Sequence, residues 1–269
     1  MAESETRSPR EGDVAMNPLD ELAASAGTEH PRFLRWMIFA AIAGLAAGVT
    51  SWGIGDAFLN TFKTPLSAVQ IGPITLMQAT TPSTNATNAK NATLTFVILG
   101  TILGLFLGAA GGILRAAPLR AVLAGFAGII LGGLSAGLAS WPLLGIYYRQ
   151  HVPDPNDLLF PLLVLGGIWS VIGAAGGLAF CLGGGGSRHL LNAASSAFLG
   201  VLLATVVYEV IGITVFPDSH PTDPLTLSSP LRMLARVLVC TSAAVGAAMA
   251  SYPVRGARLK PDATSAELA

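Results

Sequence analysis

The sequence is poor in charge. Asp, Glu, Lys and Arg make up only 11% of its 269 residues, whereas an ordinary soluble domain carries roughly a quarter. The 15 basic and 15 acidic side chains cancel, so the composition gives no basic face for nucleic acid. These shortages exclude a soluble globule and leave no reason to expect a nucleic-acid partner.

Cysteine and known cofactor motifs are also scarce. The two cysteines, Cys181 and Cys240, lie inside apolar runs, which offers neither a disulfide framework nor zinc spacing. The sequence contains no Walker lysine, dinucleotide fingerprint or haem attachment site, and the glycine run at 183–186 lacks the lysine of a phosphate loop. We therefore expect no cofactor, no metal and no enzymatic activity.

Long apolar runs dominate what is present. Hydrophobic residues make up 52% of the chain, and a bilayer is crossed by about 20 consecutive apolar residues that must be helical to satisfy their own backbone. We therefore predict an all-α polytopic membrane protein with a six-helix domain over 33–254, an outer loop at 56–93, and disordered polar tails at 1–32 and 255–269. The expected helices span about 33–55, 94–114, 119–141, 159–181, 189–214 and 231–252.

The basic residues predict an orientation. Most Arg and Lys lie in the two tails and in the connections near 115–120 and 188. The opposite side receives only Lys63, Lys90, Arg149 and Arg232. Because Lys and Arg accumulate on the cytoplasmic side of membrane proteins, we expect a cell-membrane protein with both ends in the cytoplasm.

Short words recur along the chain. GLAAGVTSW at 44–52 returns as GLSAGLASW at 133–141, and GAAGG at 108–112 returns at 173–177. This recurrence predicts three tandem helical hairpins in parallel orientation, with a degraded third copy. Mitochondrial carriers also have six helices in three repeats, but their Pro-x-Asp/Glu-x-x-Lys/Arg signature is absent here, so the chain is not assigned to that family.

Small residues recur at helical spacing. A run of glycines four apart presents a groove without side chains, through which helices in lipid approach closely. The favoured interpretation is a glycine zipper at helix contacts, and the alternative is the lining of a narrow pore. The candidate packing positions are Gly44, Gly48, Gly100, Gly104, Gly108, Gly112, Gly128, Gly132, Gly173 and Gly177.

Two charged residues fall well inside the predicted helices. Glu209 and Arg236 both lie about five residues from the outer ends of adjacent helices, roughly 7 Å deep. Buried charges in membranes are usually paired, so we predict a structural ion pair. A role in gating or in a substrate site, and independent snorkelling to the headgroups, remain alternatives.

Two further patterns resemble chemical sites. The outer loops pair a histidine with a carboxylate twice, which suits a divalent cation, although Asp-Pro pairs are better explained as turns. These candidates are His151, Asp154, His220 and Asp223. Ser135 lies in a G-x-S-x-G pattern, and rhomboid proteases also have six-helix cores. However, Ser135 lies roughly 20 Å in depth from His189, too far for a catalytic pair.

The function is expected to be non-enzymatic. The leading hypothesis is a small transporter or channel-like subunit, with a water-filled cavity at the midplane lined by Asn192, Thr205, Tyr208 and Glu209. The alternative is a scaffold or assembly partner, which predicts a closed bundle with a face left for another membrane protein or a second copy. An intramembrane hydrolase using Ser135 is a remote third hypothesis.

Overall fold

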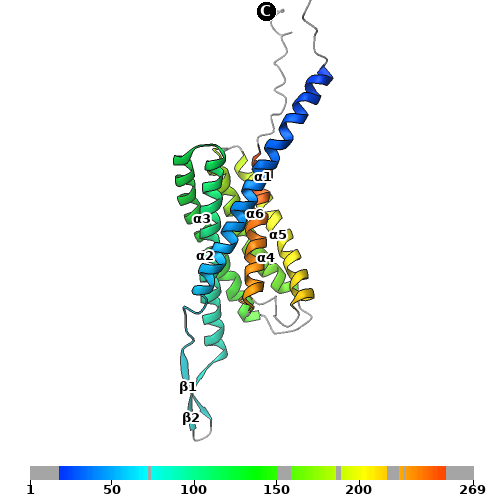
Figure 1. Ribbon diagram of the computed structural model, residues 1–269. Helices are drawn as coiled ribbons and strands as arrows, with labels where there is room; N and C mark the ends of the chain where they lie inside the picture. The colour runs from blue at the N-terminus through cyan, green and yellow to red at the C-terminus, as the bar shows by residue number, and fades with distance from the viewer. Residues whose placement is uncertain are drawn as a thin grey trace, which may run out of the picture. The chain divides into compact units, whose positions relative to one another are not determined.

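The computed structural model describes residues 18–71, 74–150, 159–185, 189–216, 224–226 and 228–252. Figure 1 shows long helices and one short β-hairpin. The elements are α1 (Pro18–Ala57), β1 (Leu66–Ile71), β2 (Ile74–Ala79), α2 (Thr81–Leu114), α3 (Pro118–Gln150), α4 (Leu159–Gly183), α5 (Leu190–Val215) and α6 (Ser229–Ser251).

The fold class expected from the sequence is confirmed. Six helices of the described chain are long and apolar enough to cross a membrane. The spans are Phe33–Ala57, Thr81–Leu114, Pro118–Arg149, Leu159–Gly183, Leu190–Val215 and Ser229–Ser251. The chain is therefore an all-α, multi-pass membrane protein.

The chain divides into two compact units, Met1–Arg35 and Trp36–Ala269. Helix α1 begins at Pro18, so residues 18–32 are helical where the sequence analysis expects a disordered tail. The local sequence explains where the helix begins, because proline suits the first helical position. All contacts described below lie within the second unit.

The expected outer loop at 56–93 contains strands β1 and β2 and the first turns of α2. Helix α2 begins at Thr81 because Thr80 and Ser83 form a reciprocal capping box and a proline occupies the first turn. Helix α3 continues through Pro142 to Gln150. At about 1.5 Å per residue, these two helices exceed the roughly 30 Å hydrocarbon thickness. Their extra turns lie at the end of the bundle that carries strands β1 and β2, which we call the β-hairpin end.

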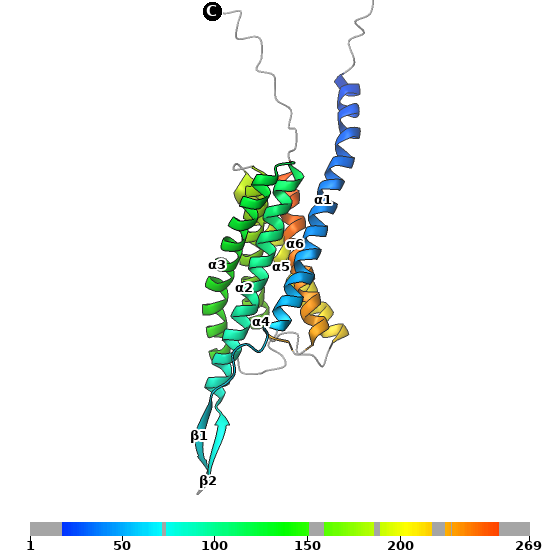
Figure 2. The same cartoon turned by 60° about the vertical axis from the view of Figure 1, so that its left-hand side comes forward.

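Strands β1 and β2 form an antiparallel pair in which Leu66 faces Ala79 and Ile71 faces Ile74. Figures 1 and 2 both show this β-hairpin extending beyond the helices. Every residue of β2 is exposed. The apolar side chains of this segment therefore do not cover the described helices.

Burial alternates along the series of helices. In the most apolar stretches of α2, α4 and α6, 50%, 67% and 50% of residues are buried, against 28%, 33% and 33% in α1, α3 and α5. The even-numbered helices therefore form the inner part of the bundle, with α4 the most enclosed.

The closest backbone contact joins α2 to α3. A Cβ atom on Gly100, Gly104 or Gly108 would overlap the carbonyl of Gly132, Gly128 or Ala124, respectively. A Cβ on Gly112 would meet the backbone of Ala121. Without hydrophobic drive in lipid, this close approach supplies packing contact, and it places the predicted small-residue face of α2 at a helix interface.

Two further antiparallel interfaces use small residues in the same way. A Cβ on Gly177 of α4 would lie 2.5 Å from the carbonyl oxygen of Ala193 on α5, and one on Gly173 would lie 2.5 Å from a methyl carbon of Val201. On α1, Gly44 and Gly48 face the α6 backbone. A Cβ on Gly44 would lie 2.6 Å from the carbonyl oxygen of Cys240, and a Cβ on Gly48 would lie 2.8 Å from the Cα of Val237. The packing candidates thus lie at helix contacts.

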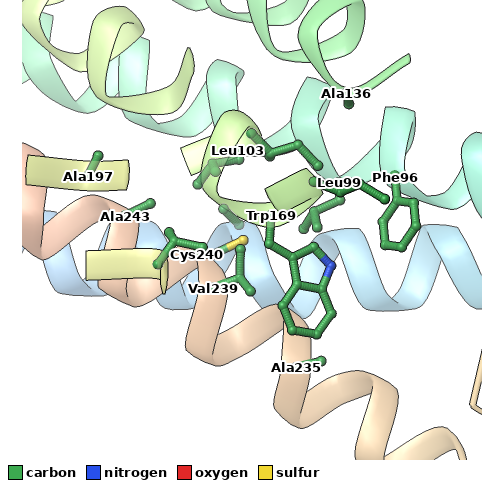
Figure 3. Packing of buried hydrophobic residues seen from close by; sticks show 14 of the residues in the cluster. Phe96, Leu99, Leu103, Ala136, Trp169, Ala197, Ala235, Val239, Cys240 and Ala243 are labelled. Carbon is green, nitrogen blue, oxygen red and sulfur yellow. The ribbon is translucent and has the colours of Figure 1, made fainter. Parts of the chain in front are cut away.

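The buried core lies between the inner helices. Figure 3 shows the indole of Trp169 on α4 lying between Leu99 of α2 and Val239 of α6. Leu99 and Val239 are each 1% exposed, and Cys240 is fully buried. Large apolar side chains therefore fill the centre of the bundle.

Candidate functional site

The most developed polar site lies at the β-hairpin end, where α1 ends and α6 begins. The salt bridge of the described chain joins Arg232 Nε to Asp56 Oδ1 at 2.9 Å, and Arg232 Nη2 donates to Asp56 Oδ2 at 3.1 Å. This two-point contact matches the planar guanidinium to the carboxylate. It joins the end of the first helix to the start of the last.

Neighbouring groups complete this contact. Ser229 Oγ donates to Asp56 Oδ2 at 2.8 Å, and Trp52 Nε1 donates to Ser229 Oγ at 3.3 Å. Arg232 Nη1 donates to the carbonyl of Thr226. The Asp56 carboxylate therefore has three hydrogen bonds from α6 and is fully neutralised by Arg232.

Arg236 lies one turn deeper on α6 and has no such partner. Its side chain is only 8% exposed, and Nη1 donates to the carbonyl of Ser51 on α1. No carboxylate in the described part of the chain forms an ion pair with it. The polar cluster thus holds two guanidinium groups and one carboxylate.

Gly55 makes room for the Arg236 head group. A Cβ at this position would overlap the guanidinium nitrogens. By contrast, Gly53 has open space where a Cβ would be. The absence of a side chain at Gly55 therefore permits Arg236 to lie against the last turns of α1.

A small cavity adjoins these arginines. Its volume is about 40 Å³, room for a few water molecules. Aromatic and hydroxyl side chains from α2, α4, α5 and the segment before α6 complete its wall. The polar and aromatic residues around it are Thr95, Phe96, Trp169, Tyr208, Thr226, Arg232 and Arg236.

Glu209 does not form the expected ion pair with Arg236. It is 7% exposed, and both carboxyl oxygens lack a hydrogen-bond partner within the described residues. A carboxyl group without a partner in this environment is costly when ionised. The structure therefore leaves two buried groups of opposite charge separate instead of forming a structural clamp.

The packing of α6 explains this separation. Its contact with α5 lies at Ser242, against Gly200, whereas its contact with α1 lies at Val237 and Arg236, against Gly48. Arg236 and Ser242 are six positions apart, which at about 100° per residue turns them roughly 120° from each other around the helix. Glu209 and Arg236 lie at similar depth on adjacent helices, but this does not bring them into contact because Arg236 is turned toward α1.

The residues expected to line a midplane cavity do not gather around one. Tyr208 borders the small cavity, whereas Asn192 is exposed. Thr205 is fully buried and its Oγ1 donates to the Val201 carbonyl at 2.9 Å. Of the four expected residues, one therefore lines the cavity that lies beside the arginines.

Ser135 is also engaged locally. Its Oγ donates to the Gly132 carbonyl at 3.1 Å, as serine hydroxyls in helices commonly do. The outer-loop candidates His151, Asp154, His220 and Asp223 lie outside the described residues. Within the described ranges no group of three His, Cys, Asp or Glu could hold a metal ion.

Two residues of structural importance were missed by sequence reasoning. The sequence prediction placed Asp56 in the outer loop. A lone acidic residue at the end of an apolar helix was the available signal that it has a partner on a neighbouring helix. Asn91 is buried and fixes the chain after α1, because its amide accepts from Phe62 N at 2.9 Å and donates to Phe62 O at 3.0 Å. A polar amide beside the start of an apolar run was the available signal.

A second, larger hollow lies outside this cluster, between the extended turns of α2 and α3. Its volume is about 550 Å³. Lys90, Trp141, Tyr148 and Arg149 line it with smaller residues, and Asn85 Nδ2 donates to the Tyr148 carbonyl at 3.2 Å. Exposed cations beside aromatic rings are typical of the headgroup level of a bilayer.

The chain was compared with known proteins at three levels. No protein-family model, no curated protein and no solved structure matches it.

Proposed function

We propose that this protein is a non-enzymatic membrane component that acts as an assembly partner, and that its β-hairpin binds an extended segment of another polypeptide. The observation that carries the proposal is the projecting pair of strands, whose apolar side chains have no cover from the described chain. Leu66, Ile74, Leu76 and Met77 are 58%, 60%, 48% and 64% exposed. Such a patch on a soluble surface marks an interaction site.

The strand edges support the same interpretation. No charged residue lies between Lys63 and Lys90, whereas solitary strand edges are usually protected by charge. A two-stranded sheet alone is marginally stable in water. An added third strand would satisfy the edge and cover apolar side chains, as in recognition by strand addition.

The helical bundle favours this function over transport. The inner helices contact each other through large apolar side chains such as Leu103, Leu107 and Ile168, all fully buried. The cavity beside the arginines has a volume of only about 40 Å³, well below the several hundred Å³ of a site for an organic solute. This packing is what the assembly hypothesis predicts.

Photocrosslinking in native membranes tests the proposal. A photoreactive amino acid at Leu76 should give one discrete adduct, and the additional substitution Met77→Lys should abolish it. Thr75→Lys, on the same exposed strand but without loss of an apolar group, is the matched control and should weaken the adduct less. An adduct of twice the chain mass would identify the partner as a second copy. A probe at the exposed helix residue Leu138 gives the background yield of adduct. If the yield at Leu76 does not exceed that background, partner binding is refuted.

A transporter remains a second candidate, favoured by one observation. Intramembrane charges usually mark function, and Glu209 and Arg236 are both buried without an ion-pair partner among the described residues. A transporter must open a water path past them. Thr205→Cys should then react with a water-soluble thiol reagent during activity, whereas the assembly hypothesis predicts that it stays protected because Thr205 is fully buried.

We also propose that both chain ends are cytoplasmic and that the bundle consists of three related helical hairpins. The distribution of Arg and Lys supports the orientation. The alternation of inner and outer helices supports the repeat, because a parallel repeat about an axis along the membrane normal gives the second helix of each unit the same position. Similar small-residue interfaces between α2 and α3, α4 and α5, and α6 and α1 agree with that arrangement.

A further inference from the structure

The larger hollow, between the extended turns of α2 and α3, lies where the hydrocarbon of a bilayer ends. The hydrocarbon is crossed by about 20 helical residues. Counted from Leu114 at the opposite end of α2, its boundary falls near Leu94. Lys90, which lines the hollow, therefore lies roughly 6 Å beyond the boundary, at the level of the lipid headgroups.

The α3 side of the hollow spans the same depth. Asn85 of α2 donates to the Tyr148 carbonyl of α3, and the two helices are antiparallel, so Lys90 lies within one turn of the level of Trp141. Arg149 lies about two turns further out than Trp141. The hollow thus has an aromatic ring and a cation at its inner level and a second cation at its outer level.

An exposed apolar stripe on α3 leads into this hollow. Leu134, Leu138 and Trp141 are all exposed, and their spacing of four and then three residues places them on one face of the helix. Gly145, four residues further on, continues that face, and both Trp141 and Gly145 line the hollow. A lipid chain that lies along the leucines would therefore have its polar end in the hollow.

The charge of the hollow is complementary to an anionic headgroup. Lys90 and Arg149 are both exposed, so a headgroup can reach them from the lipid phase. The described residues that line the hollow include no acidic side chain. A volume of about 550 Å³ is within the range of sites for small organic molecules, and basic pockets beside transmembrane helices suit lipid phosphates.

We propose that this hollow binds the headgroup of one anionic phospholipid. The phosphate lies between Lys90 and Arg149, the glycerol region contacts Trp141, and an acyl chain lies along Leu134 and Leu138. The bound lipid stabilises the extended turns of α2 and α3 against each other. The proposal is independent of the β-hairpin function, because neither strand contributes to the described lining of the hollow.

Thermal unfolding of the purified full chain in a non-ionic detergent tests the proposal. The chain is titrated with dioleoyl-phosphatidylglycerol, with dioleoyl-phosphatidylcholine or with glycerol phosphate. Because a ligand that binds only the folded state stabilises it, phosphatidylglycerol should raise the Tm saturably, by roughly 2–4 °C at several times its Kd. Phosphatidylcholine, whose terminal ammonium is repelled by the two cations, should have a smaller effect.

Two outcomes of the titration would overturn the proposal. Equal Tm values in the two lipids would show that the hollow does not select an anionic headgroup. A rise in glycerol phosphate as large as that in phosphatidylglycerol would show that a free phosphate ester is sufficient and that the apolar stripe contributes nothing.

Charge variants assign the effect to the hollow. Lys90→Gln and Arg149→Gln should each move the midpoint of the phosphatidylglycerol titration to about five-fold more lipid. Lys63→Gln removes an exposed cation that does not line the hollow, and as the matched control it should leave the midpoint unchanged. An unchanged midpoint in either hollow variant, or an equal change in Lys63→Gln, would refute the site.

A variant that keeps both charges separates binding in the hollow from general attraction of anionic lipid. No atom lies within 4 Å of the place where a Cβ of Gly145 would be, so the side chain of Gly145→Leu would occupy the hollow without overlap. This variant should also move the midpoint to several-fold more phosphatidylglycerol. A midpoint equal to that of the wild type would show that the lipid binds elsewhere.

Discussion

Substitution of Gly104 by alanine tests the packing of α2 on α3. The added methyl group would overlap the carbonyl of Gly128. Because that carbonyl belongs to the helix backbone, it cannot rotate away as a side chain could, and the two helices must separate. Overpacking of this kind typically costs about 1–3 kcal/mol.

The gain in helix propensity opposes this cost. Alanine is more favourable than glycine within a helix by roughly 0.5–1 kcal/mol. Taking the middle of each range, the net destabilisation expected for Gly104→Ala is about 1 kcal/mol. For a chain of this size, that corresponds to a decrease in Tm of roughly 2–4 °C.

Gly145→Ala is the matched control. Gly145 lies on α3, and no atom lies within 4 Å of the place where its Cβ would be. This variant should gain propensity without overlap, so its Tm should rise slightly. The assay is thermal unfolding of each variant in the same detergent. A Tm for Gly104→Ala equal to or above that of the wild type would refute the reasoning.

Four further substitutions test the β-hairpin end by the same unfolding assay. Asp56→Asn should destabilise the fold by about 2–4 kcal/mol, because it removes the carboxylate that Arg232 contacts at two points, and an unchanged Tm would argue against the bridge. Glu209→Gln should leave the Tm unchanged or raise it, since neither carboxyl oxygen has a partner within the described chain. A clear decrease in Tm would instead support the ion pair with Arg236 that the sequence predicts. Asn91→Ala should cost roughly 1–3 kcal/mol through two lost hydrogen bonds to Phe62, with Asn88→Ala as a control of similar helix position. Thr80→Ala should cost about 1 kcal/mol through the lost cap of α2, and a Tm equal to that of the wild type would count against it.

The sequence predicted the helices well because the thickness of the bilayer sets how long an apolar helix must be to cross it. The centres of all six spans lie within the helices of the structure. The small-residue pattern also indicated where backbones come close, since only residues such as Gly104 and Gly128 permit that distance. Both predictions depend on local composition alone.

The ends of the helices and the direction of polar side chains were harder to predict. Hydropathy stops at the membrane boundary, so it gave no sign that α2 continues outward to a capping box at Thr80 and Ser83. Similarly, depth along α5 and α6 placed Glu209 level with Arg236 but did not give the rotation of α6. Such rotation depends on which neighbour each helix face contacts, and only tertiary packing determines this.

The β-hairpin and the N-terminus should lie on opposite sides of the membrane. Thr75→Cys in β2 and, separately, Ser8→Cys near the N-terminus can be labelled in intact cells with a membrane-impermeant maleimide. Native Cys181 and Cys240 are buried and should contribute little background. The account predicts labelling at position 75 in intact cells and at position 8 only after the membrane is permeabilised. Labelling of both positions from the same side of the membrane would contradict it.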